Sequence, residues 1–185
     1  MTLDAQIVLA VQRFFLSAPW TIALAVFLAR WLIIADVFPA IWLAVSRKAG
    51  ERHAVLEAAW SGGLALLLTS VLSRLIMRPR PFLAIAEVVR LIPPPYNASF
   101  PSGHTATAVA IACALWFGNR RAGLVAFAIA LFVMLGRVAV GVHYPTDLLG
   151  GIAVGAGSFA LTRFIHHGLR RRDISRSANA HHHSA

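Results

Sequence analysis

The chain has 185 residues, a formal net charge of +10, 58% hydrophobic residues and a mean hydropathy of +0.71. A water-soluble domain contains about 45–50% apolar residues, so this composition excludes an ordinary soluble domain and indicates one membrane domain. The positive charge lies between apolar segments, which is typical of cytoplasmic loops, and we expect no nucleic-acid partner. The single cysteine, Cys113, excludes an intramolecular disulfide and a Cys-based zinc site.

Residues 3–16 are predicted to form an amphipathic helix that lies in the membrane interface. Its apolar residues recur at roughly helical spacing and are Leu3, Ile7, Val8, Val11, Phe14 and Phe15. Its other side carries Asp4, Gln6, Gln12 and Arg13. A short N-terminal extension of the first membrane span is the alternative.

Five membrane spans are predicted, over residues 21–45, 54–77, 103–118, 123–140 and 147–165. The third and fourth are short for ~30 Å of hydrocarbon, and we expect them to cross where their ends line a water-filled site. The predicted fold is therefore an all-α polytopic transmembrane bundle of about five spans with an N-terminal interfacial helix. Residues 1–170 form its single domain. Residues 171–185 are predicted to be a disordered basic cytoplasmic tail, whose His181–His183 run is either native or a tag remnant.

Alternate connections between the spans are basic, which predicts the orientation of the chain. The basic residues are Arg47, Lys48, Arg52, Arg120, Arg121, Arg163 and Arg170–Arg172. These connections are expected on the cytoplasmic face. The connections 78–102 and 141–146 then lie on the periplasmic or extracellular face, and they carry the candidate catalytic residues.

Pro101-Ser102-Gly103-His104 precedes the third span. Ser102 suits a helix N-cap, and Gly103 permits close approach of a ligand to the backbone. A helix N-terminus binds phosphate well, and His104 is placed to donate a proton to a leaving oxygen. An ordinary helix cap with an interfacial histidine is the alternative.

Arg137, His143 and Asp147 lie around the turn between the fourth and fifth spans. A carboxylate beside a histidine fixes the tautomer of the ring, and a neutral ring nitrogen can then attack phosphorus. The spacing to Asp147 favours His143 over His104 as the nucleophile. The alternative has Asp147 as a helix-dipole partner and His143 as an interfacial residue.

Arg78-Pro79-Arg80-Pro81-Phe82 follows the second span. Guanidinium groups offer planar forks to phosphate oxygens. An interfacial anchor is the alternative, although the positive-inside rule does not predict arginines on the outer face. Together, the three motifs place two histidines, one aspartate and several arginines on one membrane face. This set suits phosphoryl transfer, which depends mainly on positioning and charge stabilisation.

The order of these motifs over residues 73–150 resembles the type-2 phosphatidic acid phosphatase superfamily. The resemblance implies a metal-independent lipid phosphatase without a cofactor, in which His143 forms a phosphohistidine, Asp147 activates it and His104 protonates the leaving group. It also implies that Arg80, Arg137, Ser102 and Gly103 bind the phosphoryl oxygens.

Two positions depart from the pattern of that family. Ser73 stands where the family carries Lys, and Arg74 or Arg78 is the candidate replacement in substrate binding. Gly136 stands where the third motif usually has Ser. The segments Arg78–Phe82, Leu91–Pro93 and Ala98–Ser102 resemble the bacitracin-resistance type of undecaprenyl pyrophosphate phosphatase.

This subgroup resemblance implies an enzyme of the bacterial inner membrane that acts at the outer face to recycle the lipid carrier of peptidoglycan synthesis. Phosphatidylglycerophosphate, phosphatidate and lipid A are alternative substrates. An alternative of another class is a lipid-phosphate transporter or binding protein that uses only the arginines. Membrane lipids are expected partners in either case.

Overall fold

The computed structural model describes residues 1–46, 48–93 and 98–182, and every regular element in these ranges is a helix. The all-α prediction is confirmed for this part of the chain. In chain order the elements are α1 (Leu3–Phe15), α2 (Pro19–Arg30), the short 3-10 helix η1 (Leu32–Asp36), α3 (Val37–Ala44), α4 (Ala49–Ile76), α5 (Pro81–Ala84), α6 (Gly103–Gly118), α7 (Arg120–Ala139) and α8 (Pro145–His182).

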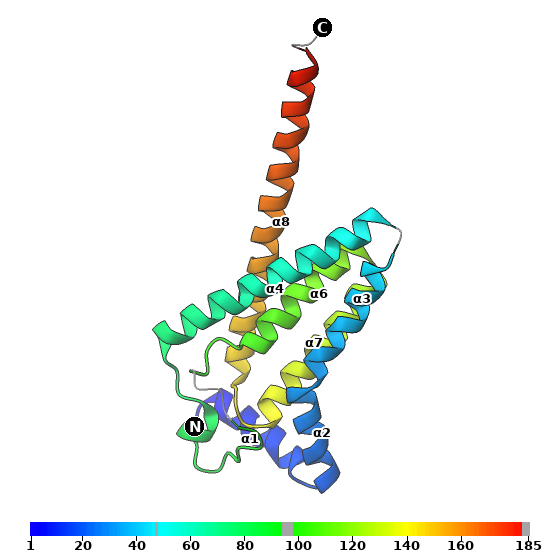
Figure 1. Cartoon of the computed structure of the whole chain (residues 1–185). Helices are drawn as coiled ribbons and strands as arrows, with labels where there is room; N and C mark the ends of the chain where they lie inside the picture. Colours follow the sequence, from blue (N-terminus) through cyan, green and yellow to red (C-terminus); the bar gives the residue numbers. More distant parts are fainter. Residues whose placement is uncertain (47, 94–97, 183–185) are drawn as a thin grey trace.

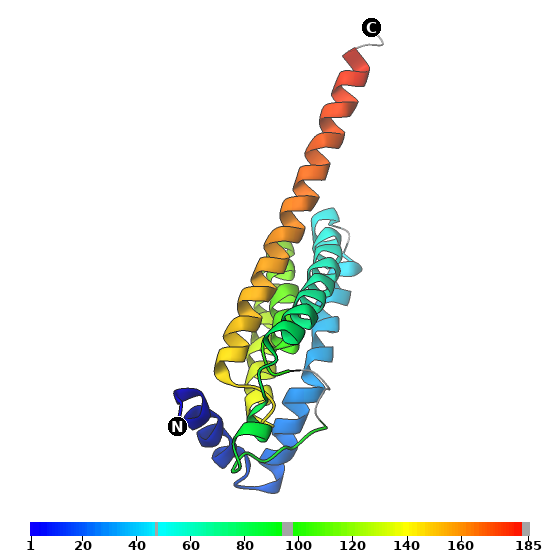
Figure 2. The ribbon, with the colours of Figure 1, turned by 90° about the vertical axis from the view of Figure 1, so that its left-hand side faces the viewer.

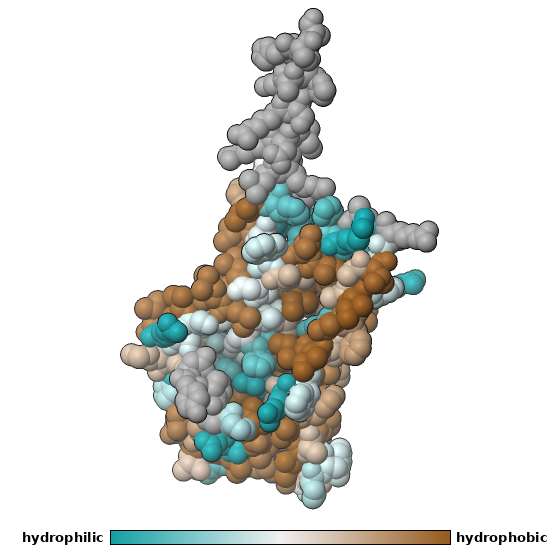
Figure 3. Space-filling view, in the orientation of Figure 1, coloured by the Kyte–Doolittle hydropathy of each residue, from teal (hydrophilic) through white to brown (hydrophobic). Residues whose placement is uncertain are grey.

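The long helices identify a multi-pass membrane protein. Three segments are long and apolar enough to cross a membrane, namely Gly50–Ala84, Arg120–Ala139 and Pro145–His166. The bent pair α2 and η1–α3 makes a fourth span if it crosses as one unit. Apolar side chains cover much of the bundle face that Figure 3 shows, as expected for a surface in contact with lipid. The structure thus supports three to four spans by length and composition, whereas five were predicted.

The predicted first span is not one continuous helix. The chain leaves the α-helix after Arg30, forms η1 and resumes as α3, with a bend of 50° between the two parts. Pro39 explains why the chain forms the tighter 3-10 helix η1 at this point. A proline cannot donate a backbone hydrogen bond, and its ring crowds the carbonyl four residues earlier.

Helix α6 lies inside the bundle, packed against α4, α7 and α8 (Figure 1). Small side chains on several of its faces allow this close packing. Its fully buried alanines are Ala106, Ala108, Ala110, Ala112 and Ala114. With 16 residues, α6 is about 24 Å long, which is why it falls short of a full span by length.

Helix α1 is separate from α2 and lies across one end of the bundle (Figures 1 and 2). Its polar residues were expected to face away from the apolar side, but Gln12 is only 2% exposed. The Gln12 amide donates to the carbonyls of Val89 and Ala139 and accepts from the Val89 N–H. Polar side chains therefore hold α1 on the bundle. Its location in the membrane interface stays a prediction.

Helix α8 continues well beyond the predicted end of the fifth span. It reaches His182, so it includes residues 171–182, which were expected to be disordered (Figure 1). Residues 183–185 lie outside the described ranges. The division into a domain and a tail stays a prediction.

Candidate active site

The three motifs meet at one end of the bundle. The loop after α4, the start of α6 and the turn between α7 and α8 lie together there, and α1 crosses the same end (Figure 1). The basic connection between α6 and α7 lies at the opposite end. The predicted separation of basic and motif-bearing connections is therefore confirmed for these segments.

His143 is buried in the turn before α8, and its two ring nitrogens have different neighbours. Nδ1 lies 3.5 Å from Oδ2 of Asp147, too far for a well-formed hydrogen bond. Nε2 lies 3.5 Å from Nη1 of Arg80. Nδ1 therefore faces the Asp147 carboxylate, and Nε2 faces Arg80. Nε2 is the nitrogen placed to attack a phosphoryl group.

The protonation state of His143 suits a nucleophile. Burial lowers the pKa of His143 to about 4, and the positive charges of Arg137 and Arg80 act in the same direction, whereas Asp147 opposes them. The imidazole is therefore neutral at pH 7, and one ring nitrogen carries a free lone pair.

Asp147 is fully buried in the first turn of α8 and is held on both oxygens. Oδ2 accepts from the backbone N–H of Tyr144 at 2.8 Å and from the hydroxyl of Ser99. Oδ1 accepts from Nη1 of Arg78 at 2.6 Å. These bonds fix the carboxylate beside His143.

Arg80 is 3% exposed, and two backbone carbonyls hold its guanidinium. Nη1 donates to the Val142 carbonyl at 2.8 Å, and Nη2 donates to the Ala98 carbonyl at 3.0 Å. The first bond ties Arg80 to the turn that carries His143. A rigid cation therefore lies directly beside the candidate nucleophile.

Arg137 is the second buried cation at this end of the bundle, on the last turn of α7. Its Nη1 donates to the carbonyl of Ala29 at 3.2 Å, and its Nε has no hydrogen-bond partner among the described residues. Ala29 lies in the last turn of α2, where carbonyls lack α-helical partners. The break in the first span therefore provides the carbonyl that orients Arg137.

Ser102 is the N-cap of α6, as predicted. Its Oγ accepts from the Thr105 N–H at 3.4 Å, and its own N–H donates to the Asp147 carbonyl at 3.0 Å. His104, in the first turn, has Arg137, His143 and Arg80 as electrostatic neighbours. The cap thus links the start of α6, with Gly103 and His104, to the His143–Asp147 pair.

Glycines on α8 allow this close approach, and sequence reasoning missed them. A Cβ on Gly151 would lie 2.8 Å from the Ser102 carbonyl oxygen, and one on Gly155 would lie 2.4 Å from the Ala106 carbonyl oxygen. The spacing Gly151-x3-Gly155 was the available signal, because small residues four apart let helices pack closely in membranes.

The two remaining arginines that were predicted to bind substrate differ in their surroundings. Arg78 donates to Asp147, Thr146 and Asp4, so both of its terminal nitrogens contact protein groups. Arg74 is exposed on the last turn of α4. Ser73 beside it is buried, and its hydroxyl has no hydrogen-bond partner in the described part of the chain. Phosphate binding by Arg74 or Arg78 stays a prediction.

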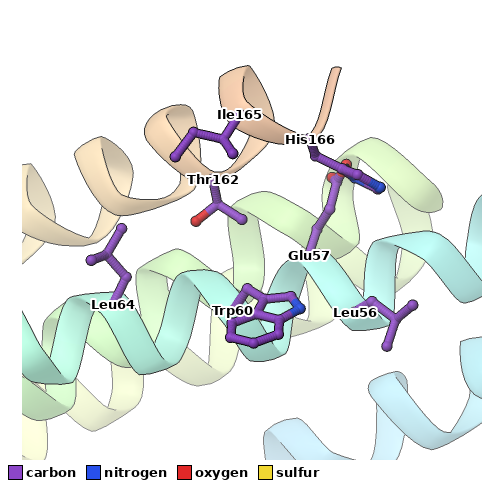
Figure 4. Close-up of a pocket in the computed structure, with 7 residues that line it drawn as sticks. All are labelled: Leu56, Glu57, Trp60, Leu64, Thr162, Ile165 and His166. Carbon is purple, nitrogen blue, oxygen red and sulfur yellow. The ribbon is translucent and has the colours of Figure 1, made fainter. Parts of the chain in front are cut away.

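A groove of about 400 Å³ lies between α4 and α8, away from the three motifs (Figure 4). Its lining residues are Leu56, Glu57, Trp60, Leu64, Thr162, Ile165 and His166. Glu57 accepts from Arg163 at 3.1 Å and lies 3.2 Å from His166. The groove belongs to the half of the bundle that carries the basic connections, and it contributes nothing to the His143 site.

Residues 54–171, more than half of the chain, match the sequence model of the PAP2 superfamily.

The chain belongs to the PAP2 superfamily.

This assignment confirms the family that the three motifs predict. The PAP2 chain is 40% identical over 103 residues to the undecaprenyl-diphosphatase BcrC of Bacillus subtilis, an overlap of 56% of this chain and 53% of that protein. The chain therefore spans about half the length of this relative. It is 30% identical over 140 residues to the putative undecaprenyl-diphosphatase YbjG of Escherichia coli, covering 75% of this chain and 70% of that protein.

A solved PAP2 structure has the same fold. The crystal structure of a PAP2-type phosphatidylglycerolphosphate phosphatase from Bacillus subtilis matches with a TM-score of 0.67 and 26% identity. The match covers 89% of this chain and 85% of that one. The described residues contain no group of three side chains suited to a metal ion, and metal independence stays a prediction for experiment.

Gly136, which departs from the usual third PAP2 motif, is required by packing. A Cβ at this position would lie 2.5 Å from the Ala29 nitrogen and 2.7 Å from the Leu28 carbonyl carbon. We expect Gly136→Ser to destabilise the protein by about 1–3 kcal/mol, because α2 must move. Thermal unfolding in detergent measures this, with Gly157→Ser as the control, since Gly157 has open space around it. Equal melting temperatures for the two variants would contradict the packing argument.

Proposed function

We propose that this PAP2 protein hydrolyses undecaprenyl diphosphate to undecaprenyl phosphate and inorganic phosphate at the outer face of the bacterial inner membrane. The observation that carries the proposal is the placement of His143 Nε2 beside Arg80, with Nδ1 facing Asp147. Transport or simple binding of a lipid phosphate needs no such oriented histidine. A PAP2 lipid phosphatase is therefore favoured over a transporter or binding protein.

The proposed chemistry proceeds through a covalent phosphohistidine. The lone pair of His143 Nε2 attacks the terminal phosphorus, and the bond from phosphorus to the bridging oxygen breaks. The bonding electrons leave with the undecaprenyl phosphate oxygen, to which the cationic form of His104 donates a proton and so becomes neutral. His104 then accepts a proton from the water that attacks the phosphohistidine, and phosphate departs.

Charge stabilisation is assigned to groups that converge on the same place. Arg80 and Arg137 are buried cations whose orientation is fixed by backbone carbonyls. The N-terminus of α6, which begins at Gly103 after the Ser102 cap, adds free N–H groups and the positive end of the helix dipole. Fixed donors of this kind stabilise the charge that develops on a phosphoryl group.

The choice of substrate is supported by the relatives. BcrC and YbjG carry undecaprenyl-diphosphatase names, at 40% and 30% identity. Phosphatidylglycerophosphate is the main alternative, because the solved Bacillus subtilis structure carries that activity in its title. Phosphatidate and lipid A remain further alternatives within the same chemistry.

The membrane arrangement is part of the proposal. We place five spans, in which α6 crosses as a short helix because it lies inside the bundle, and α1 rests in the outer interface. The positive-inside rule puts Arg120 and Arg121 in the cytoplasm and the His143 site outside. Residues 1–170 then form the phosphatase domain.

The proposal is tested by phosphate release from purified protein in detergent with EDTA. Undecaprenyl diphosphate, phosphatidylglycerophosphate, phosphatidate and lipid A serve as parallel substrates. We expect a clear preference for the polyprenyl diphosphate and little effect of EDTA. Preference for a glycerolipid or lipid A would overturn the substrate, and a strict need for added divalent metal would overturn the chemistry.

The acid side of the activity profile gives a further prediction. Attack requires neutral His143, so activity falls as pH drops through the pKa of this residue. Burial lowers that pKa from 6.5 to about 4, in a site where Arg137, Arg80, His104 and Asp147 face the ring. The fall in kcat/KM that comes from protonation of the enzyme is therefore expected well below pH 6.5.

Separating enzyme and substrate ionisation makes this test decisive. The ionisation of the lipid phosphate is measured by phosphorus NMR in the same micelles and subtracted from the profile. If the corrected kcat/KM profile still falls with a midpoint at or above pH 6.5, the result would contradict a neutral buried His143.

A further inference from the structure

Asp4, in the first turn of α1, is joined to the His143–Asp147 pair by Arg78. Nη2 of Arg78 donates to Asp4 Oδ2 at 2.8 Å, and Nη1 donates to Asp147 Oδ1 at 2.6 Å. The centroid of the Tyr144 ring lies 4.1 Å from the guanidinium carbon of Arg78, so the ring covers one face of the guanidinium group. One arginine fork therefore connects α1, the loop after α4 and the first turn of α8.

Asp4 also fixes the start of α8 directly. Its Oδ1 accepts from the Thr146 N–H at 3.2 Å, and its Oδ2 accepts from the Thr146 hydroxyl. Burial alone would raise the pKa of Asp4, but hydrogen bonds from Thr146 and Arg78 lower it below its ordinary value. Asp4 is therefore a charged cap on a helix 142 residues away in the chain.

Asp147 depends on this arrangement because it is fully buried. A buried carboxylate needs a cation close by, and neutral His143 does not supply one. Arg78 supplies it at 2.6 Å on Oδ1. The same contact sets the rotation of the carboxylate, which determines where Oδ2 lies relative to Nδ1 of His143.

We propose that Asp4 and Arg78 are positioning residues that hold Asp147 against His143, so that the docking of α1 on the bundle sets the rate of turnover. The inference rests on the proposed function, because it takes His143 and Asp147 as the reacting pair. In this proposal Arg78 binds the carboxylates of Asp4 and Asp147, and other groups bind the phosphate of the substrate.

The kinetic test compares Asp4→Asn, Asp4→Glu and Arg78→Lys in the full-length protein. Asp4→Asn keeps the shape of the side chain and removes the charge, and Arg78→Lys removes the fork that reaches both carboxylates. By analogy with the groups that orient metal-bound histidines, whose loss costs about 10- to 100-fold in activity, each of these two is expected to lower kcat by about that factor, with KM within about threefold of the parent. Asp4→Glu should restore most of kcat. A rise in KM with kcat unchanged would overturn positioning in favour of substrate binding.

A double variant tests whether the two residues act in series. Arg78→Ala with Asp4→Asn should lose no more activity than Arg78→Ala alone. Thr2→Ala is the matched control, because it removes the N-cap of α1, where Thr2 Oγ1 accepts from the Ala5 N–H at 3.3 Å, and leaves Asp4 in place. Additive losses, or a kcat loss in Thr2→Ala equal to that in Asp4→Asn, would overturn the proposal.

A structural measurement separates this proposal from the proposed function. The ring nitrogen resonances of His143, assigned with His143→Asn, should move in Asp4→Asn and Arg78→Ala and stay in place in Thr2→Ala. If the parent protein hydrolyses none of the lipid phosphates, the proposed function fails. The resonances still show whether Asp4 and Arg78 position Asp147 against His143. Unchanged resonances in both Asp4→Asn and Arg78→Ala would refute it.

Discussion

His143→Ala is expected to lower kcat by about 10⁴-fold or more, the scale on which removal of a covalent nucleophile acts. The reason is the position of Nε2, which lies 3.5 Å from Arg80 Nη1 on the side of the ring away from Asp147. His143, and not His104, is the assigned nucleophile, because Asp147 contacts His143. Phosphate release at saturating lipid measures the loss.

His53→Ala is the control for this substitution, since His53 lies near the start of α4 at the other end of the bundle. The control should retain the activity of the parent. Circular dichroism and thermal unfolding establish that the His143 variant still folds. A folded His143→Ala protein with a tenth of the parent activity would refute the assigned nucleophile.

Arg80→Lys is expected to lower kcat by about 10²- to 10³-fold, which is the cost of removing one preorganised donor to a developing oxyanion. The two terminal nitrogens of Arg80 are held by the carbonyls of Val142 and Ala98, so the fork has a fixed orientation beside His143. A lysine keeps the charge, but its single ammonium group cannot reproduce the planar geometry.

Arg90→Lys provides the comparison, because Arg90 is exposed in the same connection between α4 and α6 and lies over the ring of Phe82. Steady-state kinetics on the same lipid should leave this control near the parent. If Arg80→Lys also stays within about threefold of the parent, Arg80 does not stabilise the phosphoryl group.

Local patterns predicted those parts of the fold that depend on nearby residues. Ser102 caps α6 because a short hydroxyl side chain precedes an apolar helical run. The break after Arg30 was missed, although Pro39 was visible, because average hydropathy over residues 21–45 does not report helix continuity. Helix α8 continues past residue 165, where the predicted fifth span ends, because hydropathy marks the end of an apolar segment and does not report the end of a helix.

The candidate site was predictable where a motif carries its own geometry, as with His143 and Asp147 four residues apart. The partners of those motifs were not predictable, because they come from distant segments. Ser99 and Asp4 bond to groups that lie 48 and 142 residues away in the chain, and no period or spacing connects them. The sequence showed Gly136 only as a departure from the usual Ser of the third motif, whereas the close approach of the α2 backbone explains the glycine.

The central claim, covalent catalysis by His143, is tested most directly by trapping the intermediate. The protein is mixed with a substrate that carries a labelled terminal phosphate, quenched in alkali, and analysed by peptide mass spectrometry and phosphorus NMR. The structure predicts a phosphoryl group on Nε2 of residue 143, because Nδ1 faces Asp147. A phosphoryl group on His104 or on Nδ1 of His143, or turnover without any phosphoenzyme, would contradict it.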